Sequence, residues 1–357
     1  MPSENYFQLP LRVAESLGLE PTVFTLWDQR FPSSASRFEI IDGIGVRRFK
    51  GSAELLLALR DQAPRLVHGH SYGWVPSALA PYLSGKYIFT AHSADNRRHP
   101  VFIRKALNHL LAKSTIFIAL SQSEARDFQP YLGDRIRIIP HPVDIAFFGE
   151  DDPATETRLR EQFDHAPLIF AVGNLTPVKN FETLLIAFER VHKEYPLTRL
   201  VIAGASPKFV GGVNSSRKYS GQYLPSLLQL AARLGLTDCV SFVGHLPPQL
   251  LRAYFHIASA YVHTSLRECQ SLSTGEAAAA GTPLVLSNIP VFREYYADAA
   301  LFFERGNAGQ LEQQLLRVMS EPSSMKGLSS KAHDCVRRFD PKLIFQSMRR
   351  AYEQCLT

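Results

Sequence analysis

The segment SLRECQSLSTGEAAAAGTP, residues 265–283, decides the fold of the second half of this 357-residue chain. The apolar run Ala260–His263 precedes it and the run Pro283–Ser287 follows it, and both runs predict strands. Between them, Ser273–Ala280 predicts a helix that Gly281 and Pro283 end. A strand, a helix and a second strand in this order form a βαβ unit, whose two strands are parallel.

The same alternation of apolar runs and helical patterns continues along the chain. The most regular helix is predicted at Phe181–Tyr195, where apolar residues recur every 3.6 positions. Further strands are predicted at Thr22–Leu26, Arg65–Gly69, Tyr87–Ala91, Thr115–Leu120, Arg135–Ile139, Leu168–Val172, Arg199–Ala203, Cys239–Gly244 and Ala300–Phe303. The sequence therefore predicts an α/β protein with parallel sheets.

A polar, proline-flanked segment near residues 145–165 separates two series of strands and helices. We therefore expect one domain over residues 1–150 and a second over residues 166–335. A last helix, 341–356, follows the second series, and we expect it to pack back on the first domain.

The composition is that of a soluble globular protein, with 45% hydrophobic and 20% charged residues. Four cysteines in 357 residues are too few for a disulfide scaffold, and they form no C-x-x-C pair, which argues against a zinc site or a dithiol motif. No apolar run reaches the ~18 residues of a membrane helix, and no signal peptide is visible. We therefore expect a cytoplasmic protein. The formal net charge of +6 leaves open a solvated surface, a phosphorylated substrate or peripheral contact with an acidic membrane, whereas nothing indicates nucleic acid.

The segment AVGNLTPVKN, residues 171–180, has the features of a phosphate-binding turn. A strand ends at Gly173, and a polar loop with Asn174 and Lys179 leads into the helix that begins at Phe181. A helix N-terminus offers free N–H groups and the positive end of the helix dipole, and Lys179 adds a full charge. The alternative is an ordinary turn with a solvated lysine.

Two carboxylates flank the next helix start, at Glu268 and Glu276. Ser271, Leu272 and Ser273 lie between them, where free amides can bind an anion. The pattern favours a binding site, but two simpler readings remain. Glu268 can be a surface carboxylate, and Ser273 with Glu276 can form a capping box.

In the first half, LVHGH and FTAHS each place a histidine at the end of a predicted strand, His70 and His92. Neutral imidazoles there can hydrogen-bond a sugar hydroxyl, and no third ligand indicates a metal. Arg97 and Arg98 begin a basic segment, 97–113, that can face an acidic membrane or a phosphorylated acceptor. The alternative is an ordinary helix packed on its sheet.

Together these motifs resemble the retaining glycosyltransferases of family 4. Three C-terminal segments carry the resemblance: AVGNLTPVKNFETLLIAF (171–188), CVSFVGHLPPQLLRAYFHIASAYVHTS (239–265) and RECQSLSTGEAAAAGTPLVLSN (267–288), which contains an E-x7-E motif. LVHGH, FTAHS, IALSQSEA and IRIIPHPVDIAFF match weaker positions of the family. The resemblance implies the GT-B fold, in which two Rossmann-like domains with parallel sheets face a cleft.

It also implies an activity and roles for individual residues. A sugar would pass, with retention and without a metal or other cofactor, from a nucleotide-sugar donor to a glycan, lipid-linked or phosphorylated acceptor. Glu268 and His92 would be the catalytic residues. The implied donor-binding residues are Gly173, Asn174, Lys179, Gly244, Leu246, Ser271, Leu272, Ser273 and Glu276. The implied residues on the acceptor side are His70, Arg97 and Arg98.

The chain departs from the family pattern in four places. Asn174 replaces a common arginine, Cys269-Gln270-Ser271 replaces Gly-Phe-Gly, and His141-Pro142 replaces Asn-Gly. The family's first strand has no counterpart before ENYFQLPLRVAESLG, so we expect an incomplete N-terminal sheet. This departure keeps open a non-catalytic GT-B protein that binds a nucleotide, a glycan or a protein. An epimerase of the same fold and a basic membrane-binding module are further alternatives.

Overall fold

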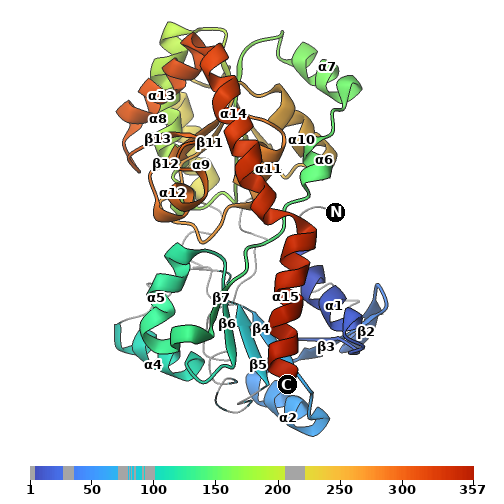
Figure 1. The fold of residues 1–357 in the computed structure, drawn as a ribbon. Helices are drawn as coiled ribbons and strands as arrows, with labels where there is room; N and C mark the ends of the chain where they lie inside the picture. The colour runs from blue at the N-terminus through green and yellow to red at the C-terminus, as the bar shows by residue number, and fades with distance from the viewer. Residues whose placement is uncertain are drawn as a thin grey trace. The chain divides into compact units, whose positions relative to one another are not determined.

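The computed structural model describes residues 5–26, 36–70, 79, 81, 83, 86–90, 92, 101–205 and 222–357. The chain forms two compact units (Figure 1). The C-terminal unit spans Pro142–Pro341, and the N-terminal unit combines Glu4–His141 with Lys342–Thr357.

The C-terminal unit is built on a parallel sheet of six strands in the order β10-β9-β8-β11-β12-β13. The strands are β8 (Leu168–Val172), β9 (Arg199–Ala203), β10 (Val240–Gly244), β11 (Ala260–His263), β12 (Leu284–Ser287) and β13 (Leu301–Phe303). The helices are α6 (Ile145–Gly149), α7 (Pro153–Gln162), α8 (Phe181–Glu194), α9 (Tyr223–Arg233), α10 (Pro248–Ile257), α11 (Leu272–Ala279), α12 (Pro290–Tyr296), α13 (Ala308–Ser320) and α14 (Pro322–Val336).

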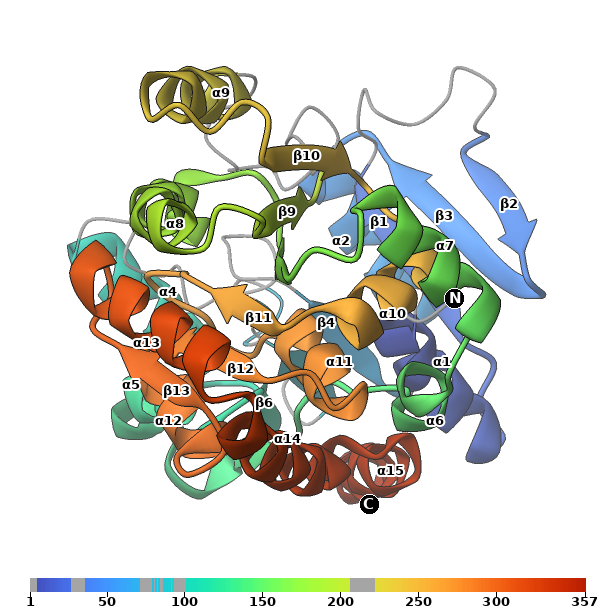
Figure 2. The same cartoon turned by 90° about the horizontal axis from the view of Figure 1, so that it is seen from above.

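Alternation along each buried strand divides the apolar side chains between the two faces of the sheet. On β8, Phe170 packs with Tyr254 and Phe255 of α10, at ring-centroid distances of 5.0 and 5.4 Å. Ile169, the next residue, belongs to the opposite core with Leu184 of α8. Helices α8 and α13 accordingly cover one face, and α10 and α11 the other (Figure 2).

The N-terminal unit has seven strands in two separate sheets within its described residues. One sheet has the order β4-β5-β6-β7 and is parallel, and the other has the order β1-β3-β2. The strands are β1 (Thr22–Leu26), β2 (Phe38–Ile41), β3 (Ile44–Phe49), β4 (Val67–His70), β5 (Tyr87–Thr90), β6 (Ile116–Ala119) and β7 (Ile136–Ile138). The helices are α1 (Asn5–Ser16), α2 (Ser52–Gln62), α4 (Val101–Leu111) and α5 (Gln122–Leu132), together with α15 (Pro341–Leu356).

The last helix, α15, returns the chain to the N-terminal unit. Ile344, Met348 and Tyr352 of α15 share a buried core with Ile88 of β5 and Ile116 of β6. The hydroxyl of Tyr352 also lies 2.8 Å from Nδ1 of His68. The N-terminal unit therefore needs residues from both ends of the chain.

The division of the chain differs from the expected boundaries at residues 142–165. The structure assigns these residues to the C-terminal unit, where α6 and α7 form. The ring of Phe148 lies 6.0 Å from that of Phe255, and Leu159 is buried in the same core. The polar composition that indicates a linker belongs to the solvent face of α7, whereas a few apolar residues attach the segment to the unit.

The structure also contains a β-hairpin, β2–β3, that the sequence analysis did not predict. Its two-residue turn is Asp42-Gly43, with φ of 51° and 82°. Positive φ at both positions is the signature of the tight turn that suits twisted hairpins, and Asp-Gly is its usual sequence.

Candidate functional site

The carboxyl ends of β8, β9 and β10 are joined through backbone groups. The amide of Gly173 donates to the carbonyl of Ala203 at 3.0 Å, and the amide of Gly204 donates to that of Gly244 at 2.7 Å. A Cβ at Gly204, whose φ is +153°, would lie 1.9 Å from the carbonyl oxygen of Gly173. Only glycine permits this approach, so the floor of this edge consists of backbone rather than side chains.

Lys179 ends a short 3₁₀ turn, Pro177–Lys179, between β8 and α8. Thr264, just after β11, donates its hydroxyl to the Lys179 carbonyl at 2.7 Å, and the amide of Leu266 donates to Val178 at 2.9 Å. The Lys179 stem passes so close to Gly173 that a Cβ there would meet its Cε at 3.0 Å. The lysine is therefore held at the junction of β8 and β11.

The Lys179 ammonium forms an ion pair with Glu268, with Nζ and Oε1 at 2.6 Å. The hydroxyl of Ser265 donates to the same oxygen at 2.7 Å. Both side chains of the ion pair are mostly buried, with exposed fractions of 18% and 15%. An incoming phosphate would therefore compete with Glu268 for the lysine.

His263, at the end of β11, completes this polar cluster. Its Nδ1 accepts from the amide of Ser265 at 3.4 Å, so Nε2 carries the proton and faces Oε1 of Glu268 at 3.6 Å. Burial, and secondarily the charge of Lys179, lowers the pKa of His263, so this imidazole is neutral at pH 7. The sequence analysis missed His263 and Ser265 because strand-end polar residues are common.

The N-terminus of α11 follows directly. Ser271 is the N-cap, and its hydroxyl accepts from the amide of Thr274 at 3.2 Å. Ser273 is held by the hydroxyl of Tyr261 at 2.8 Å. The capping box of Ser273 with Glu276 is therefore not formed, because the helix begins two residues earlier than that pairing requires.

Glu276 lies on the buried side of α11, with 8% of the residue exposed. Among the described residues, none hydrogen-bonds its carboxylate. Burial raises its pKa to about 7. A buried carboxylate without a protein partner is costly, and ligand hydroxyl groups that donate to it would remove that cost.

The remaining predicted donor residues lie at the same edge of the sheet. Gly244 ends β10 with φ of +70°, and Leu246 follows it and packs on the core of the unit. Asn174 is exposed in the turn after β8. The structure thus brings the predicted donor residues to the adjacent ends of β10, β9, β8 and β11.

In the N-terminal unit, the structure brings four histidines together at the ends of β4, β5 and β7. Nδ1 of His70 lies 2.6 Å from Nε2 of His92, and Nδ1 of His92 lies 3.2 Å from Nε2 of His141. His68 stacks on His70 at 4.1 Å. The sequence analysis placed His70 and His92 at the ends of two separate strands. The structure brings these two residues together and adds His68 and His141 to the group.

Burial lowers the pKa of all four imidazoles, because their charged forms lose water. For His68, His70 and His141, repulsion by the neighbouring imidazoles lowers the pKa further. The pKa falls to about 3 for His70 and to about 4 for His92. At neutral pH the cluster is therefore a set of uncharged hydrogen-bonding groups. The predicted residues Arg97 and Arg98 lie outside the described residues.

The comparisons with known proteins agree with this architecture. The family described as "Glycosyl transferases group 1" matches residues 155–334, and "Glycosyltransferase Family 4" matches residues 6–147. A D-inositol 3-phosphate glycosyltransferase from Frankia alni is 26% identical over 97% of this chain and 92% of its own. An alpha-monoglucosyldiacylglycerol synthase from Streptococcus pneumoniae is 27% identical over 50% of this chain and 40% of its own.

Solved structures show the same fold. A sucrose-phosphate synthase from Thermosynechococcus elongatus superposes with a TM-score of 0.83 and 19% identity, covering 99% of this chain and 93% of that one. Anabaena HepE in complex with UDP-glucose superposes with a TM-score of 0.74 and 18% identity, and the match covers 87% of this chain and 86% of HepE.

The fold and the sheet edge therefore define a GT-B protein with two Rossmann-like units, as the resemblance implied. The chain belongs to the group 1, family 4 glycosyltransferases. Among the described residues, no helix combines the length and apolar character that crossing a bilayer requires.

Proposed function

We propose that the protein transfers a sugar, with retention of anomeric configuration, from a nucleoside-diphosphate sugar to a hydroxyl of a phosphorylated or lipid-linked acceptor. The observation that carries this proposal is the convergence of Lys179, Glu268, the start of α11 and Glu276 at one sheet edge. A cation, free amides and two carboxylates match the diphosphate and hydroxyl groups of such a donor.

Each group has a distinct proposed role. The diphosphate replaces Glu268 as the partner of the Lys179 ammonium and binds the amides of Ser271–Ser273. The carboxylate of Glu276 accepts hydrogen bonds from the ribose hydroxyls. The base lies on the backbone at Gly244–Leu246, beside the glycines that join the strand ends. Glu268, released from the ion pair, turns to the donor sugar. Fixed dipoles and one lysine stabilise the leaving diphosphate, so we propose that transfer needs no metal or other cofactor.

The acceptor hydroxyl is assigned to the histidine cluster of the N-terminal unit. His70, His92 and His141 are neutral, so they can hydrogen-bond a sugar or polyol hydroxyl without attracting a counter-ion. His92 is the central member of the chain of imidazoles.

The acceptor class rests on α4. Val101 and Phe102 are 57% and 73% exposed, and Lys105 is exposed one turn further along. Exposed apolar side chains beside a basic residue suit the headgroup region of an anionic membrane. Two relatives bear names that specify an inositol phosphate and a diacylglycerol glycolipid, in keeping with a phosphorylated or lipid-linked acceptor.

The donor site is tested by thermal unfolding with UDP, GDP and ADP. We expect one nucleotide, UDP first because HepE holds UDP-glucose, to raise Tm. Lys179→Ala should weaken the binding of that nucleotide by roughly 10–100-fold, because a hydrogen bond to a charged group contributes about 1.5–3 kcal/mol. Lys193→Ala, which removes an exposed lysine from α8, is the matched control. If no nucleotide changes Tm, the proposed donor site is wrong.

Turnover separates the proposed enzyme from the alternatives. With a matching sugar nucleotide, release of nucleotide that depends on acceptor supports transfer, and the anomeric configuration of the product tests retention. Binding without turnover favours the non-catalytic protein, whereas conversion of the donor to its epimer without acceptor favours the epimerase. Co-sedimentation with vesicles, with and without anionic lipid and with Phe102→Asp, tests the membrane contact.

A further inference from the structure

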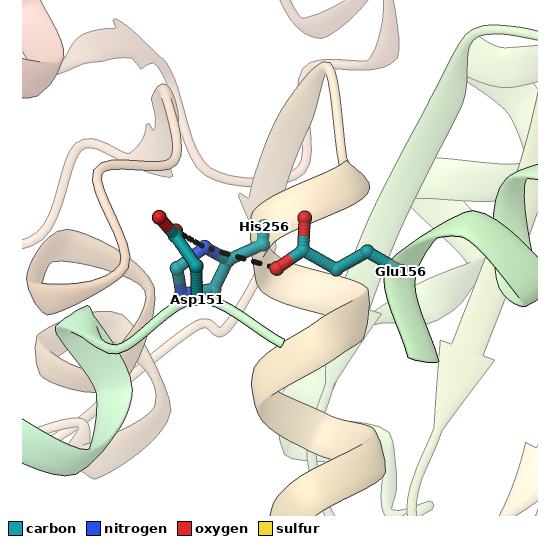
Figure 3. A group of neighbouring side chains, drawn as sticks. All are labelled: Asp151, Glu156 and His256. Carbon is teal, nitrogen blue, oxygen red and sulfur yellow. Dashed lines mark ion pairs between the residues drawn. The ribbon is translucent and has the colours of Figure 1, made fainter. Parts of the chain in front are cut away.

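Asp151, Glu156 and His256 meet in the C-terminal unit (Figure 3). Asp151 precedes α7, Glu156 lies in its first turns, and His256 lies near the end of α10. Nδ1 of His256 is 3.2 Å from Oδ1 of Asp151 and 3.6 Å from Oε1 of Glu156. Figure 3 shows both carboxylates directed toward the imidazole ring.

The second nitrogen of His256 defines the state of the ring. Nε2 lies 2.7 Å from the carbonyl oxygen of Phe148, which can only accept, so Nε2 carries a proton. In the neutral ring Nδ1 then has a free lone pair, directed at two carboxylates. The His256 side chain is only 9% exposed, so this orientation is held by packing. A histidine that ligates a metal commonly donates its other N–H to a carbonyl in this way.

The surrounding charges leave a net negative group. Four acidic residues lie between positions 150 and 156, and Arg252 pairs with two of them, Glu150 at 3.2 Å and Asp152 at 3.7 Å. Glu156 also accepts the amide of Asp152 at 3.1 Å, which fixes its carboxylate at the start of α7. The two remaining carboxylates, Asp151 and Glu156, can therefore be balanced at Nδ1 of His256 by a proton or by a metal ion between the three side chains.

We propose that Asp151, Glu156 and His256 bind a divalent transition-metal ion of the zinc class. Ligands about 2.0–2.2 Å from Zn²⁺ lie roughly 3.3–3.6 Å apart in a tetrahedron. The two distances from His256 Nδ1 are close to this range, and all three ligand atoms lie within 4.8 Å of one another. One imidazole and two carboxylates suit zinc rather than magnesium, which favours an all-oxygen shell. Asp151 and His256 also line a cavity of about 400 Å³, through which the ion and a water ligand can enter.

The site lies near the amino ends of the strands, whereas the predicted donor residues lie at their carboxyl ends. Helix α10 starts after the carboxyl end of β10 and runs back to the amino end of β11, so His256 is close to that amino end. The ion would join the segment before α7 to α10, two elements that already pack together. Its role is therefore to stabilise the C-terminal unit, independently of the proposed transfer reaction.

The test is calorimetric titration of the full chain, freed of metal, with ZnCl₂ at neutral pH. We expect saturable binding of one Zn²⁺ and a rise in Tm, with no binding of Mg²⁺ at the same concentration. Asp151→Asn should leave the fold intact, because this side chain is 78% exposed. It should weaken Zn²⁺ binding by at least ~10-fold, because even mutation of residues that hydrogen-bond the ligands lowers metal affinity by about 10–100-fold. Glu156→Gln and His256→Ala should do the same.

His165→Asn is the matched control, because it removes an exposed imidazole from the same unit and keeps a residue that tolerates its φ of 56°. It should bind Zn²⁺ as the unmodified chain does. Equal Zn²⁺ affinity in Asp151→Asn and the unmodified chain, or no saturable binding, would overturn the metal site. A Tm loss in Asp151→Asn that is the same with and without Zn²⁺ would likewise identify the cluster as an ion pair alone.

Discussion

At the scale of single residues, Glu276 combines a proposed role in donor binding with a cost in stability. Its carboxylate is buried on α11 without a hydrogen-bond partner among the described residues. The pKa is about 7 in the folded chain, against an ordinary value of 4.5. The folded state therefore holds a proton that the unfolded state releases between these pH values, and the unfolding free energy falls as pH rises through this window.

Glu276→Gln is expected to stabilise the C-terminal unit at pH 8, by up to about 3 kcal/mol, since each pKa unit corresponds to about 1.36 kcal/mol. The gain should vanish below pH 4.5, where the carboxyl is protonated in both states. Denaturant unfolding at pH 4 and pH 8 measures both values. The same variant should bind the donor nucleotide more weakly, because an amide is a poorer acceptor for ribose hydroxyls. A loss of stability at pH 8 would contradict this account.

At the scale of elements, the joined ends of β8 and β9 shape the sheet edge at which we propose that the donor binds. Gly204 brings its backbone onto that of Gly173, and no side chain fits between them. This contact and the hydrogen bond from Gly204 to Gly244 join the ends of β8, β9 and β10, where the β9–β10 register shifts between Phe242 and Gly244.

Gly204→Ala is expected to lower the unfolding free energy of the C-terminal unit by about 3 kcal/mol, from steric overlap and the unfavourable φ together. Denaturant unfolding at pH 7.5 checks this value. Gly327→Ala is the matched control, since it lies in α14 with open space around the new methyl group. It should raise stability by up to about 1 kcal/mol, because alanine favours helix. Equal effects of the two substitutions would refute the close approach.

At the scale of the whole molecule, the chain leaves the N-terminal unit after His141 and returns to it at Lys342. Removal of residues 342–357 would expose the core that α15 shares with Ile88 and Ile116. We expect hydrogen exchange to accelerate in β4–β7 and to remain slow in β8–β13. Uniform acceleration in both units would show that α15 is not a specific part of the N-terminal core.

Acid should also act strongly on the N-terminal unit. The pKa values of His70 and His92 are lowered to about 3 and 4, whereas the unfolded chain takes up protons near pH 6.5. The stability of this unit is therefore present above pH 6.5 and is lost as pH falls from there toward 4. At pH 5 each of the two buried histidines lowers the unfolding free energy of the unit by up to about 2 kcal/mol.

His70→Asn should make the unfolding free energy of the N-terminal unit less dependent on pH between 6.5 and 4. Thermal unfolding across that range compares the variant with the unmodified chain. His109→Asn is the control, because it removes an exposed histidine from α4 of the same unit. An unchanged pH profile for His70→Asn would show that the buried imidazole is not the acid-sensitive group.

Much of this molecule follows from local sequence. The apolar runs at Leu168–Val172 and Ala260–His263 are strands as predicted, because residues buried on both faces of a parallel sheet need unbroken apolar character. Gly173, Lys179, Glu268 and Glu276 are predictable as neighbours, because parallel strands and the turns that follow them share one edge. The motifs at those turns likewise identify the glycosyltransferase class.

Other features depend on residues far apart in the chain. No local pattern shows whether Glu276 caps a helix or binds a ligand. Its role depends on the residue at which α11 begins and on the residues that cover this helix. The pairing of Lys179 with Glu268, the meeting of His92 with His141 and the attachment of α7 to α10 are long-range contacts. Local sequence determines propensity and periodicity, whereas the tertiary structure decides burial and electrostatic partners, which set the protonation of these groups.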